Sequence, residues 1–212
     1  MEIKNIIFDF DGVILNSHNV KTDAFEKIFS KYGKSIGKKA KNYHLKNAGK
    51  SRYLKFKYIL NNVLKYKSTK KIIEYLDEEF SNYCDNKIIK LKISKYLLRY
   101  LKKNYKKKNF FVSTGTPQKK IEEIIKKKKI KKFFKKIYGS PEKKIEHINK
   151  IISKYENKSK TIFIGDSEED YKSAKICGID FLLKLNSESK NLKLPRKVNK
   201  LQSFKFIEKN FF

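Results

Sequence analysis

Residues 3–12 read IKNIIFDFDG, an apolar run with β-branched side chains that stops abruptly at Asp9, Asp11 and Gly12. Such a run is typical of a strand buried on both faces. Gly12 permits the chain to turn directly after it. The predicted strand therefore ends in two carboxylates, at the edge where α/β sheets place their functional groups.

The order of strand, polar turn and helix recurs along the second half of the chain. Strands are predicted over 108–112, 136–138, 161–164 and 181–183, and helices over 118–128, from about 142 to 155, and over 168–177. Repeated units of this kind predict an α/β fold of the Rossmann-like type, a parallel sheet with helices on both faces. Residues 187–196 are polar and are predicted to form a loop.

A different pattern occupies residues 19–89, where apolar side chains recur at helical spacing, as in Ala24, Phe25, Ile28 and Phe29. The segment predicts a small all-helical cap inserted after the first strand, placed where it can cover the carboxyl edge of the sheet. Residues 1–18 and 90–212 then form the α/β core. A loop is expected over 47–51, followed by a helix that Ser51 can cap.

Length, cysteine content and hydropathy narrow the class of protein. A chain of 212 residues is long enough for one core with a modest insertion, so one active site is expected. Cys84 and Cys177 are far apart and lie in no Cys/His cluster, which gives no support for a zinc site or a disulfide framework. The start lacks the order of a signal peptide and no apolar run is long enough to cross a membrane, so we expect a cytoplasmic protein without membrane contacts.

The formal charge of +31 is the most unusual feature of the composition. Clustered basic residues attract nucleic acid, but here lysine is spread through nearly every segment and arginine is rare. Arginine is the residue that reads phosphates and guanines bidentately, and no nucleic-acid-binding motif is present. We therefore expect no specific nucleic-acid binding, although the charge can help to attract a phosphorylated substrate.

Two pairs of acids stand at predicted strand ends, Asp9 with Asp11 and Asp166 with Asp170. Either pair alone has an ordinary interpretation, a turn for the first and a helix cap for the second. Together at one sheet edge the carboxylates would repel one another unless a hard divalent cation neutralised them. This pattern favours a Mg²⁺ site.

The other strand ends supply groups suited to an anion. Ser113 and the amides of Thr114 and Gly115 precede a helix and can donate hydrogen bonds to phosphate. After the strand at 136–138, either Lys143 or Lys144 can provide a fixed positive charge, and the sequence does not decide between them.

In their order and separation these strand ends resemble the four motifs of the haloacid dehalogenase-like hydrolase superfamily. The resembling segments are Asp9–Val13, Phe111–Pro117, Gly139–Pro141 with Lys144, and Gly165–Asp170. The helical insertion resembles the small cap of the branch that holds phosphoglycolate phosphatases and β-phosphoglucomutases.

The resemblance implies a role for each matching residue. Asp9 would be the nucleophile, Asp11 the general acid and then base, Ser113 a phosphate ligand, and Lys144 the cation that tethers phosphate and nucleophile. Mg²⁺ would be held by Asp9, the backbone carbonyl of Asp11, and Asp166, with Asp170 in the outer shell or bound through water. The expected activity is a Mg²⁺-dependent phosphatase for a small phosphorylated metabolite, such as a sugar phosphate or a phosphoglycolate-like compound, that works as a monomer.

The sequence of the cap does not identify the substrate, and two other functions are open. Residues Lys50, Ser51 and Arg52 resemble the loop that contacts the substrate in this branch, although the start of a surface helix explains them equally well. A sugar phosphomutase is the alternative, weakened because Lys21 stands where the mutases carry a histidine, with His18 nearby. A non-catalytic protein, or one that binds nucleic acid, is the minor alternative.

Overall fold

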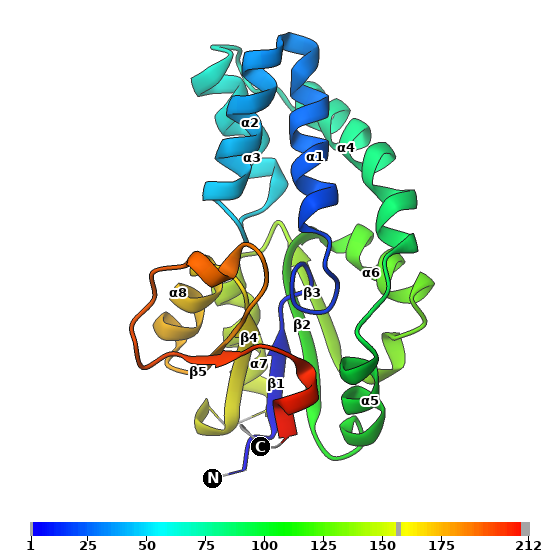
Figure 1. Ribbon diagram of the computed structural model, residues 1–212, viewed down its shortest axis with the longest axis vertical. Helices are drawn as coiled ribbons and strands as arrows, with labels where there is room; N and C mark the ends of the chain where they lie inside the picture. The colour runs from blue at the N-terminus through cyan, green and yellow to red at the C-terminus, as the bar shows by residue number, and fades with distance from the viewer. Residues whose placement is uncertain (1, 156–157, 209–212) are drawn as a thin grey trace. The chain divides into compact units, whose positions relative to one another are not determined.

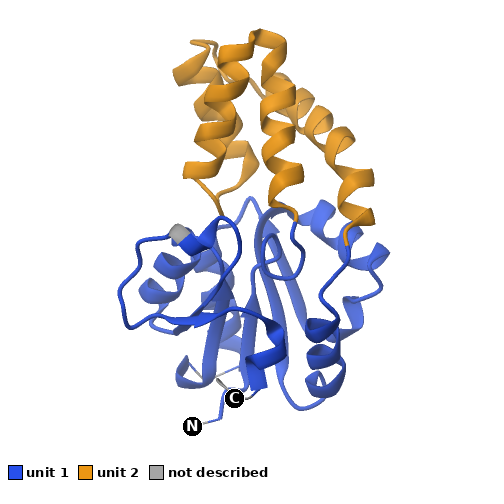
Figure 2. Ribbon diagram, viewed as in Figure 1, with its two compact units in different colours: residues 1–16, 92–212 blue, residues 17–91 orange. Residues whose placement is uncertain are grey.

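The computed structural model describes residues 2–155 and 158–208. The chain divides into two compact units, one of residues 1–16 and 92–212 and the other of residues 17–91 (Figure 2). The sequence predicts a cap over residues 19–89, and the second unit extends two residues beyond this range at each end.

The first unit contains a parallel sheet, as predicted, and six strands belong to it among the described residues (Figure 1). Its strand order is β3-β2-β1-β4-β5-β6. The strands are β1 (Asn5–Phe8), β2 (Asn109–Pro117), β3 (Lys136–Ser140), β4 (Thr161–Gly165), β5 (Asp180–Lys184) and β6 (Asn199–Leu201). The chain winds from β1 outward to β3 and then returns to the other side of β1 with β4, so β1 and β4 are neighbours at the point where the winding reverses.

One face of the sheet packs against α7 (Lys144–Tyr155) and α8 (Glu168–Cys177). Ile7 pairs in register with Phe111 and Phe163, and all three side chains are buried in one cluster with Ile148 of α7 and Ala174 of α8. Side chains alternate along a strand, so the same register directs every second residue of β1 and β2 toward these helices.

The opposite face carries Phe8 and Phe110, whose rings lie 5.7 Å apart. Tyr100 of α5 (Lys95–Asn104) packs on Phe110 at 5.7 Å, and α6 (Gln118–Lys127) follows β2. Helices therefore cover both faces, and the predicted fold class is confirmed. Neither α5 nor β6 was predicted.

The second unit is helical, as the spacing predicted. Its helices are α1 (His18–Phe29), α2 (Lys34–Lys46), α3 (Arg52–Tyr58) and α4 (Lys70–Lys90). Phe25 is the centre of its core, with ring centroids 5.4 Å from Phe56 and 5.2 Å from Phe80. A four-helix unit of this size can thus bury a core of its own, built largely from aromatic rings.

None of the described helices is both long and apolar enough to cross a membrane.

Candidate active site

The candidate site lies at the carboxyl ends of β1 and β4 in the first unit. Both strands are buried on both faces, and each is followed at once by acids, Asp9 after β1 and Asp166 after β4. Because the two strands pair in parallel with Phe8 beside Ile164, their ends lie at one level and bring the acids together.

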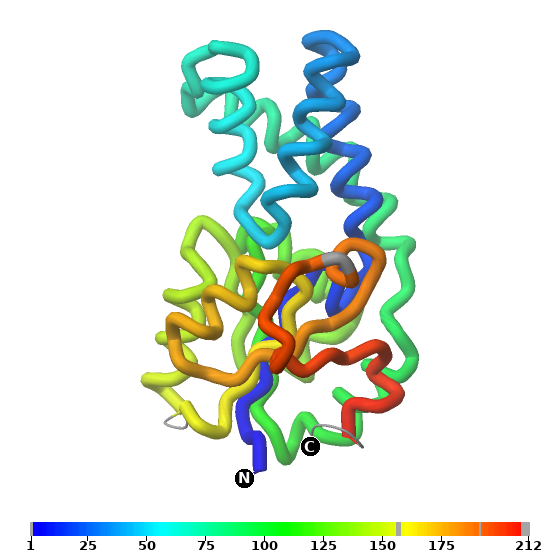
Figure 3. Tube along the Cα trace, turned by 60° about the vertical axis from the view of Figure 1, so that its left-hand side comes forward, coloured from blue at the N-terminus to red at the C-terminus, as the bar shows by residue number. Residues whose placement is uncertain are grey.

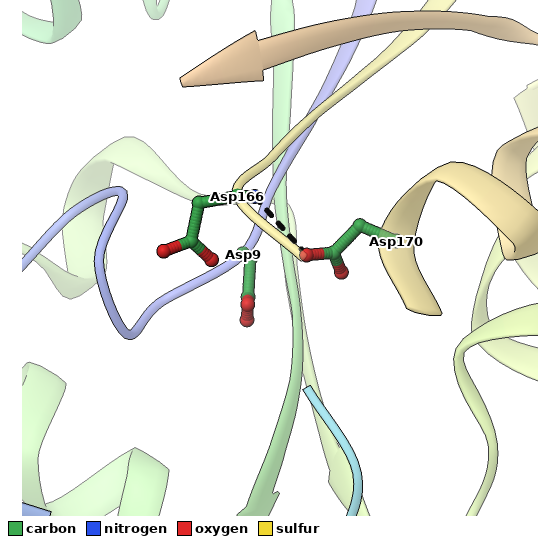
Figure 4. Close-up of side chains that lie close together, drawn as sticks. All are labelled: Asp9, Asp166 and Asp170. Atoms are coloured by element: carbon green, nitrogen blue, oxygen red, sulfur yellow. Dashed lines mark hydrogen bonds between the residues drawn. The ribbon is translucent and has the colours of Figure 1, made fainter. Parts of the chain in front are cut away.

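Three carboxylates meet there. Asp9, Asp166 and Asp170 each offer an oxygen within 4.8 Å of the others, and all three side chains are buried (Figure 4). The sequence predicted this convergence from two separate acid pairs. Asp11, the fourth predicted acid, is half-buried and its side chain does not belong to this cluster.

Asp170 is held by the start of α8. Its Oδ2 accepts hydrogen bonds from the backbone N–H groups of Asp166 and Ser167 and from the Ser167 hydroxyl, which in turn accepts from the Asp170 N–H. This reciprocal capping box satisfies N–H groups that a helix start leaves open. Gly165 leaves the necessary room, because a Cβ there would lie 2.4 Å from the Asp170 Cβ.

Lys144 provides the cation of the cluster. Its Nζ lies 3.1 Å from Asp9 Oδ2 and 2.5 Å from Asp170 Oδ1, with 4% of the side chain exposed. Lys144 is the first residue of α7 and points inward, whereas the Lys143 side chain is exposed. The structure thus distinguishes the two lysines between which the sequence could not decide.

Burial and neighbouring charge set the protonation of this cluster. Burial raises the pKa of Asp9 to about 8, Lys144 acts in the opposite direction, and Asp170, Asp166 and Asp11 raise it further. Burial opposes the charge of Lys144, but Asp170 and Asp9 outweigh it and raise the lysine pKa above its ordinary value. The single ammonium group remains charged but does not balance the acids around it.

The donor set fits a hard divalent cation. Asp9 and Asp166 offer carboxylate oxygens, and the cluster contains no thiolate or imidazole among its described members. Carboxylates, carbonyls and water are the ligands that Mg²⁺ prefers. Asp170 has both oxygens engaged by Lys144 and the α8 cap, which suits an outer position better than direct coordination.

Asp11 is held in a turn after β1. Gly12 adopts a φ of 78°, in the left-handed region that glycine tolerates, and its N–H donates to the Leu15 carbonyl at 2.7 Å. The Thr116 hydroxyl of β2 donates to Asp11 Oδ2 at 3.1 Å. The predicted turn is present, and the end of β2 helps to fix the second acid.

The predicted phosphate donors on β2 are Ser113, Thr114 and Gly115, and their surroundings differ. Ser113 shares a face with Phe111, so it points toward α7, where its hydroxyl lies 2.9 Å from His147 Nδ1 and has no exposed surface. Thr114 is buried and its Oγ1 accepts from the Thr116 N–H, while Gly115 is half-buried. The Ser113 hydroxyl is therefore hydrogen-bonded to α7, whereas the Thr114 hydroxyl is hydrogen-bonded within β2.

His147 lies beside the site without joining the acid cluster. Its side chain is fully buried, and the ring stacks on Tyr138 at 5.3 Å. Among the described residues Nε2 has no hydrogen-bond partner, although Glu142 Oε2 lies 3.9 Å from it. Burial lowers the pKa of His147 to about 4, so the imidazole is neutral at ordinary pH. His147 thus serves as a neutral hydrogen-bond partner for Ser113.

The predicted substrate residues of the cap, Lys50, Ser51 and Arg52, belong to the second unit. Ser51 caps α3, as predicted, with its hydroxyl accepting from the Tyr53 N–H. Arg52 is buried, and its Nε lies 2.5 Å from Asp77 Oδ1. Lys50 is exposed and donates to Asn47 Oδ1 at 3.0 Å. Arg52 therefore ties α3 to α4, whereas the hydrogen bond of the Lys50 side chain lies within its own loop.

Three residues at the site were not singled out from the sequence: Thr116, His147 and Asn186. Each had a weak signal: Thr116 lies within the polar end of β2, and His147 follows Lys144 by one helical turn. Asn186 follows the end of β5, and its Nδ2 donates to Asp166 Oδ2 at 2.5 Å. A polar residue at a strand's carboxyl end was its only signal.

Comparison with known proteins identifies the family of the chain. Residues 6–184 match the model of the haloacid dehalogenase-like hydrolase family, a range that includes every residue of the acid cluster and Lys144. No curated protein is significantly similar to the chain in sequence.

Solved structures share the fold along nearly the whole chain. A predicted phosphoglycolate phosphatase from Haemophilus somnus 129PT is 17% identical, with a TM-score of 0.75 over 99% of this chain and 98% of that one. A predicted phosphatase from Clostridium acetobutylicum is 19% identical, with a TM-score of 0.66 over 87% and 85%. A HAD-hydrolase from Bacillus subtilis bound to magnesium is 15% identical, with a TM-score of 0.68 over 95% of each chain.

Proposed function

The chain belongs to the haloacid dehalogenase-like hydrolases, and from that premise we propose that it is a Mg²⁺-dependent phosphatase for a small phosphorylated metabolite. The observation that carries the proposal is the buried cluster of Asp9, Asp166 and Asp170, two of which, Asp9 and Asp170, form ion pairs with Lys144. A cluster of like charges in a protein interior is unfavourable. Its presence at the carboxyl ends of neighbouring strands therefore indicates a functional site rather than a structural one.

In the proposed reaction Asp9 is the nucleophile. One of its carboxylate oxygens attacks phosphorus, an Asp9–phosphorus bond forms, and the bond from phosphorus to the substrate oxygen breaks. Asp11 donates a proton to the departing oxygen, which leaves as an alcohol. Water then attacks phosphorus, Asp11 takes its proton, and inorganic phosphate leaves with Asp9 restored.

Lys144 would stabilise the transferred group, and the polar end of β2 would orient the general acid. The ammonium of Lys144, fixed between Asp9 and Asp170, offsets negative charge that develops on the phosphoryl oxygens. The Thr116 hydroxyl keeps Asp11 in place through its 3.1 Å bond, so the acid is oriented before the substrate arrives.

Asp9, Asp166 and the backbone carbonyl of Asp11 would hold Mg²⁺, with Asp170 in the outer shell. When bound, the cation supplies positive charge that holds Asp9 ionised and offsets charge on the phosphate. One chain provides every group named, so a monomer suffices.

The second unit would select the substrate. Arg52 is committed to Asp77 and Ser81 in this structure, which favours Lys50 and Ser51 as the members of the predicted trio that remain at the loop surface. A small phosphorylated compound with hydroxyl or anionic groups would suit them. The high positive charge of the chain would speed capture of such a substrate at low salt.

Phosphate release from a panel of sugar phosphates, phosphoglycolate and nucleotides tests the proposal, with Mg²⁺ or with EDTA. We expect release by the native protein with Mg²⁺ and none with EDTA or from the Asp9→Asn variant. Asp180→Asn is the matched control, because Asp180 is exposed at the amino end of β5 and should leave the rate unchanged.

Two other outcomes point elsewhere. An isomer formed from a sugar phosphate, with a requirement for a bisphosphate primer and no release of phosphate, would favour the phosphomutase alternative. Release of phosphate by the Asp9→Asn variant at the native rate would exclude Asp9 as nucleophile and overturn the proposed mechanism.

A further inference from the structure

Asn186 joins three loops of the first unit. It lies after β5, and its side-chain Nδ2 donates to Asp166 Oδ2 at 2.5 Å and to the Gly12 carbonyl at 3.3 Å. The loop that carries it lies next to the loop after β1, the first in orange and the second in blue in Figure 3. One amide thus bridges the ends of β1 and β4, the two strands that carry the acids.

The other half of the amide holds its own loop. Asn186 Oδ1 accepts from the N–H groups of Glu188 and Ser189, both at 2.9 Å. The Asn186 N–H donates to Ser189 Oγ, which donates to the Lys184 carbonyl. Because Oδ1 is committed to two donors, the orientation of the amide is determined and Nδ2 must face Asp166.

This contact fixes one oxygen of Asp166. A carboxylate that accepts a hydrogen bond at Oδ2 has its rotation restricted, which sets the direction of Oδ1. An amide carries no net charge, so it orients Asp166 without neutralising it. Lys144 acts differently, because it offsets the charges of Asp9 and Asp170.

We propose that Asn186 is a positioning residue that orients Asp166 as a ligand for a divalent cation. The inference rests on the metal site of the proposed function. Groups that hydrogen-bond to metal ligands commonly change affinity by about 10–100-fold when removed. Asn186→Ala should therefore weaken cation binding by about that factor, with activity approaching the native rate at saturating metal.

The test uses Mn²⁺ alone, whose binding to the full chain is measured by electron paramagnetic resonance of the free ion. Asn186→Ala and Asn186→Ser are compared with the native protein. The serine variant is included so that the loop stays folded, because a serine hydroxyl can still accept hydrogen bonds from the N–H groups of residues 188 and 189. Serine is too short to replace the Asn186 side-chain donor to Asp166. The thermal unfolding of each metal-free variant is measured in parallel.

Two controls separate orientation of Asp166 from loop stability. Ser189→Ala removes hydrogen bonds of the same loop but leaves the Asn186 donor, and Asn149→Ala changes an exposed asparagine on α7. We expect both controls to bind Mn²⁺ like the native protein. The dissociation constant should rise for the two Asn186 variants even where metal-free stability is retained.

Unchanged Mn²⁺ affinity in Asn186→Ser, or an equal loss in Ser189→Ala, would overturn the role of Asn186 while leaving the metal site intact. If the native chain itself bound no Mn²⁺, the metal site of the proposed function would fail, and the role of Asn186 would fail with it.

Discussion

Replacing Lys144 by methionine tests the electrostatic account of the site most directly. The change removes the ammonium but keeps a long apolar side chain in the same volume. Asp9 and Asp170, with 4% and 0% of their side chains exposed, then lose the cation that lies 3.1 Å and 2.5 Å from their oxygens. Asp166 adds a third carboxylate beside them.

The expected loss of stability is large. Removing one partner of a buried ion pair costs about 3–5 kcal/mol, chiefly because the remaining charge stays buried without compensation. For a chain of this length, 1 kcal/mol corresponds to about 2–4 °C, so the unfolding temperature of the metal-free variant should fall by about 10 °C at neutral pH.

The loss should depend on pH in a defined direction. Burial already raises the pKa of Asp9 from 3.8 to about 8 with Lys144 present, and removal of the lysine raises it further. Between about pH 4 and the folded pKa, the folded variant then binds more protons than the unfolded chain, so its stability is greatest in acid and falls as pH rises through this window. A divalent cation should restore part of the loss.

Circular dichroism during heating measures these effects, with EDTA or with Mg²⁺, at neutral pH and at about pH 5. Lys143→Met is the matched control, since the adjacent lysine is exposed and its loss should change the unfolding temperature little. Equal stability of Lys144→Met and Lys143→Met in EDTA would refute the reasoning, because it would show that the buried acids need no cation.

Three further predictions concern other contacts. The pKa of His147 is lowered from 6.5 to about 4, so the folded chain binds fewer protons than the unfolded one between these values. Stability should therefore fall as pH drops through that window, by up to about 3 kcal/mol, and His147→Gln should reduce this loss in denaturant titrations at several pH values. Gly165→Ala should cost about 1–3 kcal/mol by thermal unfolding, because the new methyl group would displace Asp170; native stability would contradict the 2.4 Å approach. Arg52→Ala should destabilise the chain by about 1–3 kcal/mol through loss of its ion pair with Asp77, whereas a raised KM with unchanged stability would show that Arg52 contacts substrate instead.

Much of the fold could be predicted from local patterns. The spacing of apolar residues and the turn residues at the ends of elements are both properties of short segments. The apolar run before Asp9 and the strand before Gly165 show as buried strands without knowledge of their partners. Leu97, Tyr100, Leu101 and Asn104 repeat at helical spacing, so α5 was detectable in principle although it was not predicted. The strand β6 has only Leu201 buried and carries no such signal.

The candidate site was predictable where its chemistry depends on strand ends. Asp9, Asp166 and Asp170 could be placed together because parallel strands end at one edge of a sheet. The alternation that buries Phe111 against α7 also directs Ser113 there, but which helix covers that face depends on how the chain crosses over.

What the sequence by itself determined is the order of the strands from β1 to β5, the helical insertion after β1 and the strand ends that carry acids, since each follows from residues close together in the chain. Only the tertiary structure decided that Lys144 rather than Lys143 lies among the acids. It also decided that His147 is hydrogen-bonded to the Ser113 hydroxyl and that Asn186 donates a hydrogen bond to Asp166. Those contacts join residues 20 to 135 positions apart, and their partners depend on the packing of whole helices and loops against the sheet.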